Sequence, residues 1–179
     1  DQLVLAFTSA ALVGDTSGFG DHVAFVGPST HARTETAPFP FDWLDPERRH
    51  VLVSLGTVNQ SVGERVYRAA VAAVEGLDLQ AVVVAPPEML GAVPANVHVQ
   101  AFVPQLALLS HMDAVVGHGG HNTTCEALAE GLPLVLAPIR DDQPIVAQQV
   151  VDAGAGVGVE FGRIRAEGLR AALRTVLDD

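Results

Sequence analysis

The chain has 179 residues, 49% of them apolar, and a formal net charge of −11. This length suits one domain with a small extension. The negative charge excludes a nucleic-acid backbone as a partner. No apolar stretch approaches the roughly 20 residues of a membrane span. One cysteine excludes an internal disulfide framework and, with no signal peptide recognised, favours a cytoplasmic protein.

Residues 1–48 are rich in glycine and proline and contain one short apolar run at 22–26. This composition predicts a linker plus an edge strand. The chain starts at Asp1 with a strand-like segment at 3–7, so we expect a piece of a longer polypeptide. Residues 49–179 show a different pattern and are expected to form one ligand-binding domain.

In residues 49–179, short apolar runs alternate with segments of helical period. The apolar runs are 51–55, 81–85, 97–102, 114–116, 133–137 and 156–159. The helical segments are 62–74, 105–111, 122–130, 144–153 and 165–177. Buried-type strands that alternate with helices predict the α/β class, with a Rossmann-like doubly wound parallel sheet of about six strands.

The most informative segment runs from Val115 to Glu126, where an apolar strand enters a glycine turn and then a helix. Gly117, Gly119 and Gly120 let the backbone approach a ligand closely. The unpaired N–H groups and partial positive charge of a helix N-terminus favour an anion, most often phosphate. In this helix the N-cap is expected among Asn122, Thr123 and Thr124. His118 can donate to the same anion and Glu126 can accept from hydroxyls beyond it, which indicates a nucleotide-sugar site.

Other interpretations of the same residues remain open. The glycines are also compatible with tight packing alone. A zinc site from His111, His118, His121 and Cys125 lacks the usual ligand spacing. A thiol nucleophile pair of Cys125 and His121 is disfavoured because Cys125 falls inside the predicted helix, where a small core residue is expected.

Four motifs in the same order and spacing resemble the C-terminal half of the two-domain Leloir glycosyltransferases with the GT-B fold, the family of plant secondary-product, antibiotic macrolide and glucuronosyl transferases. Residues 54–57 (SLGT) resemble its S-x-G-T/S turn, and 102–105 (FVPQ) resemble W-x-P-Q. Residues 118–126 (HGGHNTTCE) resemble H-C-G-W-N-S-x-x-E, and Asp142 with Gln143 resembles the closing D-Q pair. The resemblance covers the whole chain.

The resemblance implies a role for each matching residue. The nucleobase and ribose would contact Phe102, Val103, Gln105 and Glu126. The diphosphate would contact Thr57, His118, Gly119, Gly120, Asn122 and Thr123. The donor sugar would contact His121, Asp142 and Gln143. No metal and no cofactor beyond the nucleotide-sugar co-substrate is implied.

Three departures from the plant motif bear on the roles that the resemblance implies. Phe102 and His121 replace tryptophans, and Val146 replaces an asparagine that commonly follows the D-Q pair. Members that use thymidine nucleotides often lack the acid at the position of Glu126, because deoxyribose has no 2′-hydroxyl. Glu126 therefore favours UDP over dTDP.

The resemblance implies the donor-binding domain of an inverting, metal-independent glycosyltransferase that acts on a small apolar acceptor of the natural-product class. No catalytic residue is expected in this chain, because the family's catalytic base is a histidine of the other, acceptor-binding domain. The alternatives are a nucleotide-sugar epimerase of similar architecture and a non-catalytic binding protein. Neither nucleic acid nor stable membrane insertion is expected, and a homodimer is left open.

Overall fold

The computed structural model describes residues 2–30, 35–56 and 63–178. Six parallel strands form its main sheet: β3 (Arg49–Ser54), β4 (Leu79–Val84), β5 (Val97–Gln100), β6 (Ala114–Gly117), β7 (Leu134–Leu136) and β8 (Gly156–Gly158). All six lie within or beside the apolar runs of the sequence. The predicted doubly wound α/β fold is confirmed.

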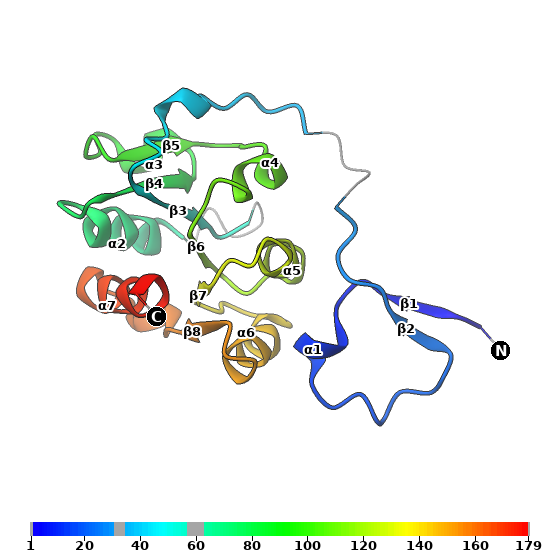
Figure 1. The fold of residues 1–179 in the computed structure, drawn as a ribbon. Coiled ribbons are helices and arrows are strands. Elements are labelled where there is room, and N and C mark those ends of the chain that lie inside the picture. The colour runs from blue at the N-terminus through cyan, green and yellow to red at the C-terminus, as the bar shows by residue number, and fades with distance from the viewer. Residues whose placement is uncertain (1, 31–34, 57–62, 179) are drawn as a thin grey trace.

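The strand order across this sheet is β5-β4-β3-β6-β7-β8. The chain starts in the middle, winds outward to β5, and then returns to wind the other way from β6. Each crossover passes over the sheet through a helix (Figure 1), as a parallel arrangement requires. The winding reverses between β3 and β6, and such a reversal leaves a crevice at the carboxyl ends of the two strands.

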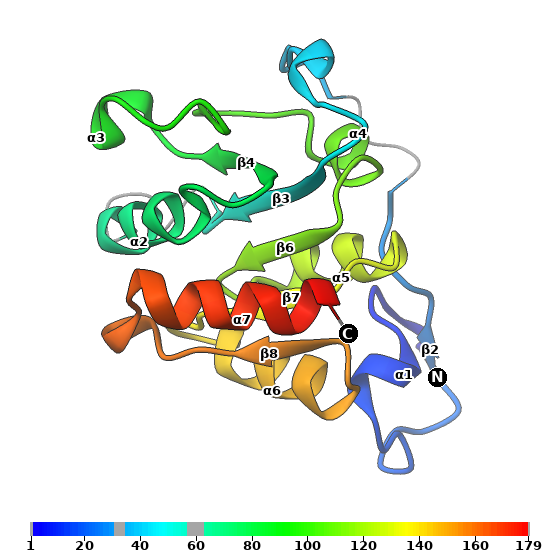
Figure 2. The ribbon, with the colours of Figure 1, turned by 60° about the vertical axis from the view of Figure 1, so that its left-hand side comes forward.

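Successive residues of a strand point to opposite faces of the sheet, and in these strands both sets are largely apolar. Helices therefore cover both faces. One face packs against α2 (Glu64–Val74) and α7 (Ala166–Asp178), which lie side by side in Figure 2. The other face packs against α4 (Gln105–Leu109), α5 (His121–Ala129) and α6 (Gln143–Asp152). In β3, Val51 and Val53 belong to the first core and Leu52 to the second. The register in which β3 pairs with β4 and β6 places the carboxyl ends of these strands at one edge of the sheet.

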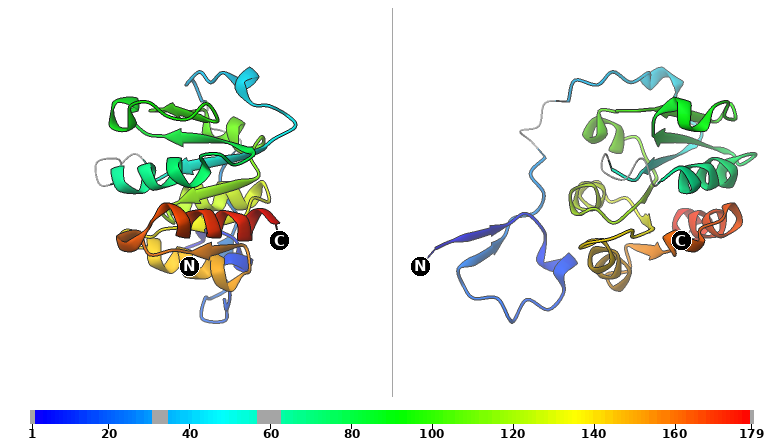
Figure 3. Two further views of the ribbon diagram at one scale, coloured as in Figure 1. Left: turned by 90° about the vertical axis from the view of Figure 1, so that its left-hand side faces the viewer. Right: turned by 180° about the vertical axis from the view of Figure 1, so that it is seen from behind.

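Residues 2–30, here called the N-terminal arm, correct one expectation. The strand expected at 22–26 forms as β2 (Val23–Phe25), but it pairs in parallel with β1 (Val4–Ala6) in a separate two-stranded sheet. It is therefore not an edge strand of the main sheet. The edges of that sheet are β5 and β8, and Figure 3 shows β1 and β2 standing apart from them.

The arm contacts the body through the short helix α1 (Ala10–Val13), which the sequence pattern did not predict. Ser9 caps this helix by accepting from the Leu12 amide at 3.1 Å. Leu12 is buried in the same core as α4, α5 and α6. A second short helix, α3 (Pro87–Leu90), follows β4.

Residues 35–48, here called the linker, cross the β5 edge of the sheet and contain a 3-10 helix, η1 (Phe41–Trp43). The Trp43 ring lies 5.4 Å from the His98 ring, and the Gln80 side chain donates to the Trp43 carbonyl at 2.8 Å. A further 3-10 helix, η3 (Phe161–Arg163), precedes α7. Among the described helices, none has the length and apolar character needed to cross a bilayer.

Candidate functional site

The predicted site residues gather at the crevice between β3 and β6. Ser54 and Gly117 end these neighbouring strands and pair with each other in register. The turn after β6 carries His118, Gly119 and Gly120 before α5 begins. Thr57, expected to hold the diphosphate from the β3 side, lies outside the described residues. The topology thus places the two glycine turns of the sequence at the position where open α/β sheets bind ligands.

The His118 ring occupies a space that only glycines leave open. A Cβ atom on Gly120 would lie 2.4 Å from Nε2 of His118, and one on Gly56 would lie 3.0 Å from Cε1. The same edge of the ring therefore packs against both glycines. This contact gives a physical reason for glycine at positions from two different strand ends, and it fixes the ring within the crevice.

His118 is 9% exposed, and its Nδ1 is buried without a hydrogen-bond partner in the described part of the chain. Burial lowers the pKa of His118, while the Ser54 backbone and the Asp142 carboxylate act in the opposite direction. The lowered pKa favours the neutral imidazole near pH 7. A buried polar group of this kind needs an explanation, and an anion that favours the charged ring would supply one.

The N-terminus of α5 differs from the expectation for its cap. The helix begins at His121 with Gly120 as the N-cap, not at Asn122, Thr123 or Thr124. Gly120 has no side chain and makes no capping hydrogen bond. Because the ring of His118 fills the space beside Gly120, a capping side chain cannot stand there. The first turn of α5 thus lacks the usual side-chain acceptor and suits an external anion.

Two residues expected at the ribose, Gln105 and Glu126, form one hydrogen-bonded group with Thr123, which is expected at the diphosphate. Nε2 of Gln105 donates to Oε2 of Glu126 at 2.5 Å and lies 3.3 Å from the Thr123 hydroxyl. Gln105 begins α4, which follows β5, whereas Thr123 and Glu126 lie on α5, which follows β6. The contact therefore joins segments that follow two strands which are not adjacent in the sheet. Glu126 is only 5% exposed. A buried carboxylate is costly without hydrogen-bond donors, and Gln105 supplies one.

A cavity of about 350 Å³ opens beside this group. Asn122, Cys125 and Glu126 line it from α5, and Phe7, Pro28 and Ser29 line it from the N-terminal arm. Its volume falls at the lower end of the range for ligand pockets, about 300–1,000 Å³. The sequence analysis missed the three arm residues because they stand in a segment interpreted as a linker. The Gly27-Pro28 pair in that segment indicates a turn, and a turn by itself does not indicate a ligand pocket.

The loop after β7 contacts the turn after β6. The Gly119 backbone, at φ +81°, approaches the Gln143 carbonyl so closely that a Cβ would lie 2.9 Å from it. The Gln143 side chain is buried, and its Oε1 accepts from the Ile139 and Arg140 amides at 2.9 and 3.2 Å. Gln143 therefore holds its own loop. That loop also contains Asp141 at φ +57°, a left-handed conformation that is uncommon outside glycine.

The residues expected at the nucleobase are less enclosed. Phe102 is 63% exposed, so its ring is open to a stacking partner. Val103 packs against the core that contains α4. Their loop follows β5, two strands from the reversal, so a ligand that reaches both Phe102 and His118 must be extended.

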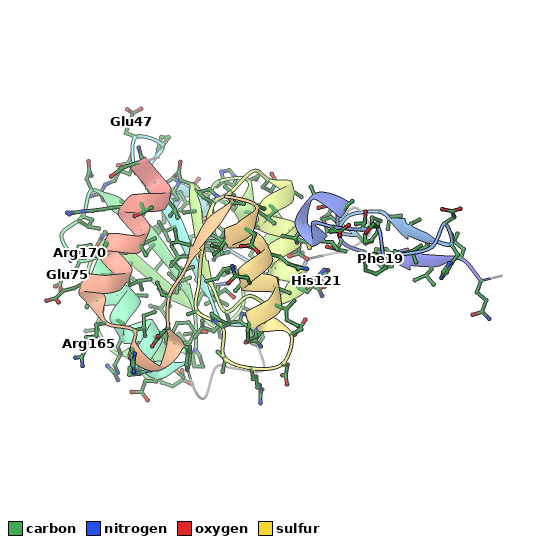
Figure 4. The ribbon with its side chains drawn as sticks, turned by 90° about the horizontal axis from the view of Figure 1, so that it is seen from below. Phe19, Glu47, Glu75, His121, Arg165 and Arg170 are labelled. Carbon is green, nitrogen blue, oxygen red and sulfur yellow. The ribbon has the colours of Figure 1, made fainter. Side chains whose placement is uncertain are left out.

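His121 and Cys125 lie next to each other on α5, 3.5 Å between Nε2 and Sγ. Burial raises the pKa of the Cys125 thiol, which opposes a thiolate nucleophile. His121 faces the N-terminal arm in Figure 4. For the zinc alternative, the described residues contain no group of three or more histidine, cysteine, aspartate or glutamate side chains placed to share a metal.

Several known proteins are similar to this chain in sequence or in fold. The 4′-demethylrebeccamycin synthase of Lentzea aerocolonigenes is 38% identical over 160 residues, 88% of this chain and 38% of that protein. The crystal structure of CalG4, the calicheamicin glycosyltransferase, superposes with a TM-score of 0.84 at 26% identity over 100% of this chain and 46% of that one. Spinosyn rhamnosyltransferase SpnG complexed with thymidine diphosphate gives 0.77 at 27% identity, over 99% and 49%.

The chain spans about half the length, or less, of the relatives it matches. Residues 30–179 match the family described as UDP-glucoronosyl and UDP-glucosyl transferase. That match covers all the strands of the main sheet and every predicted site residue. The chain belongs to this family of glycosyltransferases.

Proposed function

We propose that this chain is the donor-binding half of an inverting, metal-independent glycosyltransferase that moves a sugar from UDP to a small natural product. The main support is that Asn122, assigned to the diphosphate, and Glu126, assigned to the ribose, line the same cavity. Both residues come from α5, whose uncapped N-terminus adjoins His118. A nucleoside diphosphate carries both the negative charges and the hydroxyls that these residues would bind.

In the proposed complex the nucleotide follows the carboxyl edge of the sheet. The base stacks on exposed Phe102, with its polar edge on the Val103 backbone, and the ribose hydroxyls donate to Glu126. The diphosphate lies on the first turn of α5, held by Asn122, Thr123 and His118. The sugar reaches His121 and the loop of Asp142 and Gln143. Since Oε1 of Gln143 already accepts two amides, its direct contact with the sugar would come from the other part of its amide group.

The reaction in this proposal is a single displacement at the anomeric carbon. A base that we expect from outside these 179 residues removes the proton of the acceptor hydroxyl, and the oxygen forms the new bond as the bond to the diphosphate breaks. Charge then accumulates on the leaving diphosphate. The α5 amides and the His118 ring stabilise that charge, which is the part of catalysis that this chain supplies. The proposal also places the protein in the cytoplasm.

Calorimetric titration with UDP and dTDP tests the proposal. We expect UDP to bind about tenfold more tightly, about 1.4 kcal/mol, because dTDP offers Glu126 one hydroxyl fewer. Glu126→Ala should remove most of that preference while retaining affinity for inorganic pyrophosphate. Glu130→Ala is the matched control, since Glu130 stands one turn further along the chain and is exposed.

The outcomes separate the candidates. If neither nucleotide binds, the donor-binding function is wrong. Equal binding of both nucleotides by the unchanged protein would overturn only the choice of uridine; the similar structure of SpnG is a complex with thymidine diphosphate. An epimerase would instead convert a UDP-sugar into its 2-epimer without any acceptor, which product analysis detects.

A further inference from the structure

The linker holds the loop that precedes and begins α4, and this loop carries the nucleobase and ribose residues. Helix α4 starts after Pro104, which makes no side-chain capping bond. The amides of its first turn therefore need acceptors from elsewhere. Both carboxylate oxygens of Glu35 accept from the Leu106 amide at 3.0 and 2.8 Å, and Oε2 also lies 3.2 Å from the Ala107 amide.

A second linker contact fastens the other end of the same loop. The side-chain amide of Gln100, at the end of β5, donates to the Pro38 carbonyl and to the Phe102 carbonyl, both at 2.6 Å. Gln100 thus ties the linker and the loop together where the loop leaves the sheet. Residues 102–106 are bracketed by two linker contacts, Glu35 at the helix end and Pro38 at the strand end.

We propose that Glu35 is a positioning residue for the nucleoside, acting through the first turn of α4. The path is short: Glu35 fixes the amides of Leu106 and Ala107, and Gln105 immediately before them donates to Glu126. The inference rests on the proposed function, because it assigns Glu35 to the same nucleotide site.

This role predicts that loss of Glu35 weakens the binding of the nucleoside part of the ligand and leaves the binding of the diphosphate part unchanged. His118 and the start of α5 are positioned by β6 and by the glycine contacts, which do not involve the linker. Loss of Glu35 should therefore let the Phe102–Gln105 loop move while leaving the diphosphate part of the site in place. A residue that served stability alone would change the affinity for both parts equally or for neither.

The test compares UDP and inorganic pyrophosphate as calorimetric ligands of the same variants. Glu35→Ala should weaken UDP binding about fivefold, the size of a typical lost helix cap, and leave pyrophosphate affinity unchanged. Glu35→Gln retains an acceptor and should recover most of the UDP affinity. Glu47→Ala is the control, because Glu47 is an exposed linker carboxylate at the periphery of the body (Figure 4).

If Glu35→Ala does not fold, Gln100→Ala loosens the same loop from its other end and should show the same selective loss. Unchanged UDP affinity in folded Glu35→Ala, or an equal loss for pyrophosphate, would overturn the inference. Failure of the unsubstituted protein to bind UDP would instead overturn the proposed function, so the two failures are distinguishable.

Discussion

Gly120→Ala isolates the contact between His118 and its glycine neighbours. The Gly120 backbone has φ −63° and ψ 127°, a conformation that alanine adopts without strain, so only the added methyl group matters. Its position would be 2.4 Å from Nε2 of His118, about 1 Å inside the 3.4 Å at which ordinary contact begins. The ring must therefore move by about that amount, and Gly56, which packs against the same edge, restricts its path.

Overpacking of this kind costs about 1–3 kcal/mol of unfolding free energy. A ring displaced by about 1 Å should also weaken UDP binding on the order of tenfold. Thermal unfolding and calorimetric titration measure the two effects. Gly168→Ala in α7 is the matched control, because a Cβ atom at position 168 would meet nothing within 4 Å. This substitution should stabilise the helix by about 0.5–1 kcal/mol. The reasoning is refuted if Gly120→Ala is as stable as the unsubstituted protein and binds UDP equally well.

Three further predictions follow from single side chains. Folding lowers the pKa of His118 below its unfolded value of about 6.5. The neutral ring's contribution to the free energy of unfolding should therefore be complete above that pH and decrease as the pH falls towards the folded pKa. His118→Gln should flatten this part of a plot of melting temperature against pH. The raised pKa of Cys125 predicts slow alkylation by iodoacetamide at pH 7.5, and Cys125→Ala should bind UDP normally; rapid alkylation would contradict this. Arg170 donates to the carbonyls that end α2, and it lies beside Glu75 in Figure 4. Arg170→Ala should therefore lower the unfolding free energy, measured by urea titration, by about 1–2 kcal/mol. Arg174→Ala is its control.

The sequence was sufficient for the main sheet because each strand is apolar on both faces and each helix has its own period. The pairing of β1 with β2 was not predictable, since a three-residue parallel pair has no distinctive pattern. The N-cap of α5 was misplaced because three consecutive residues, 122–124, all favour caps, and the ring that excludes a cap comes from outside the helix. Motif spacing brought Gln105, Glu126 and His118 to one edge, but it carried no information on the long-range contact of Glu35 with Leu106.

Trp43 is the only tryptophan in the chain, and it lies half-buried in the linker against His98. All indole emission of this protein therefore originates in the segment that adjoins the nucleobase loop. Release of the linker would expose the ring to water and shift its emission to longer wavelength, while local changes elsewhere would leave the spectrum unchanged. The native protein thus contains a single-site optical reporter of linker docking, readable during nucleotide titrations without any added dye.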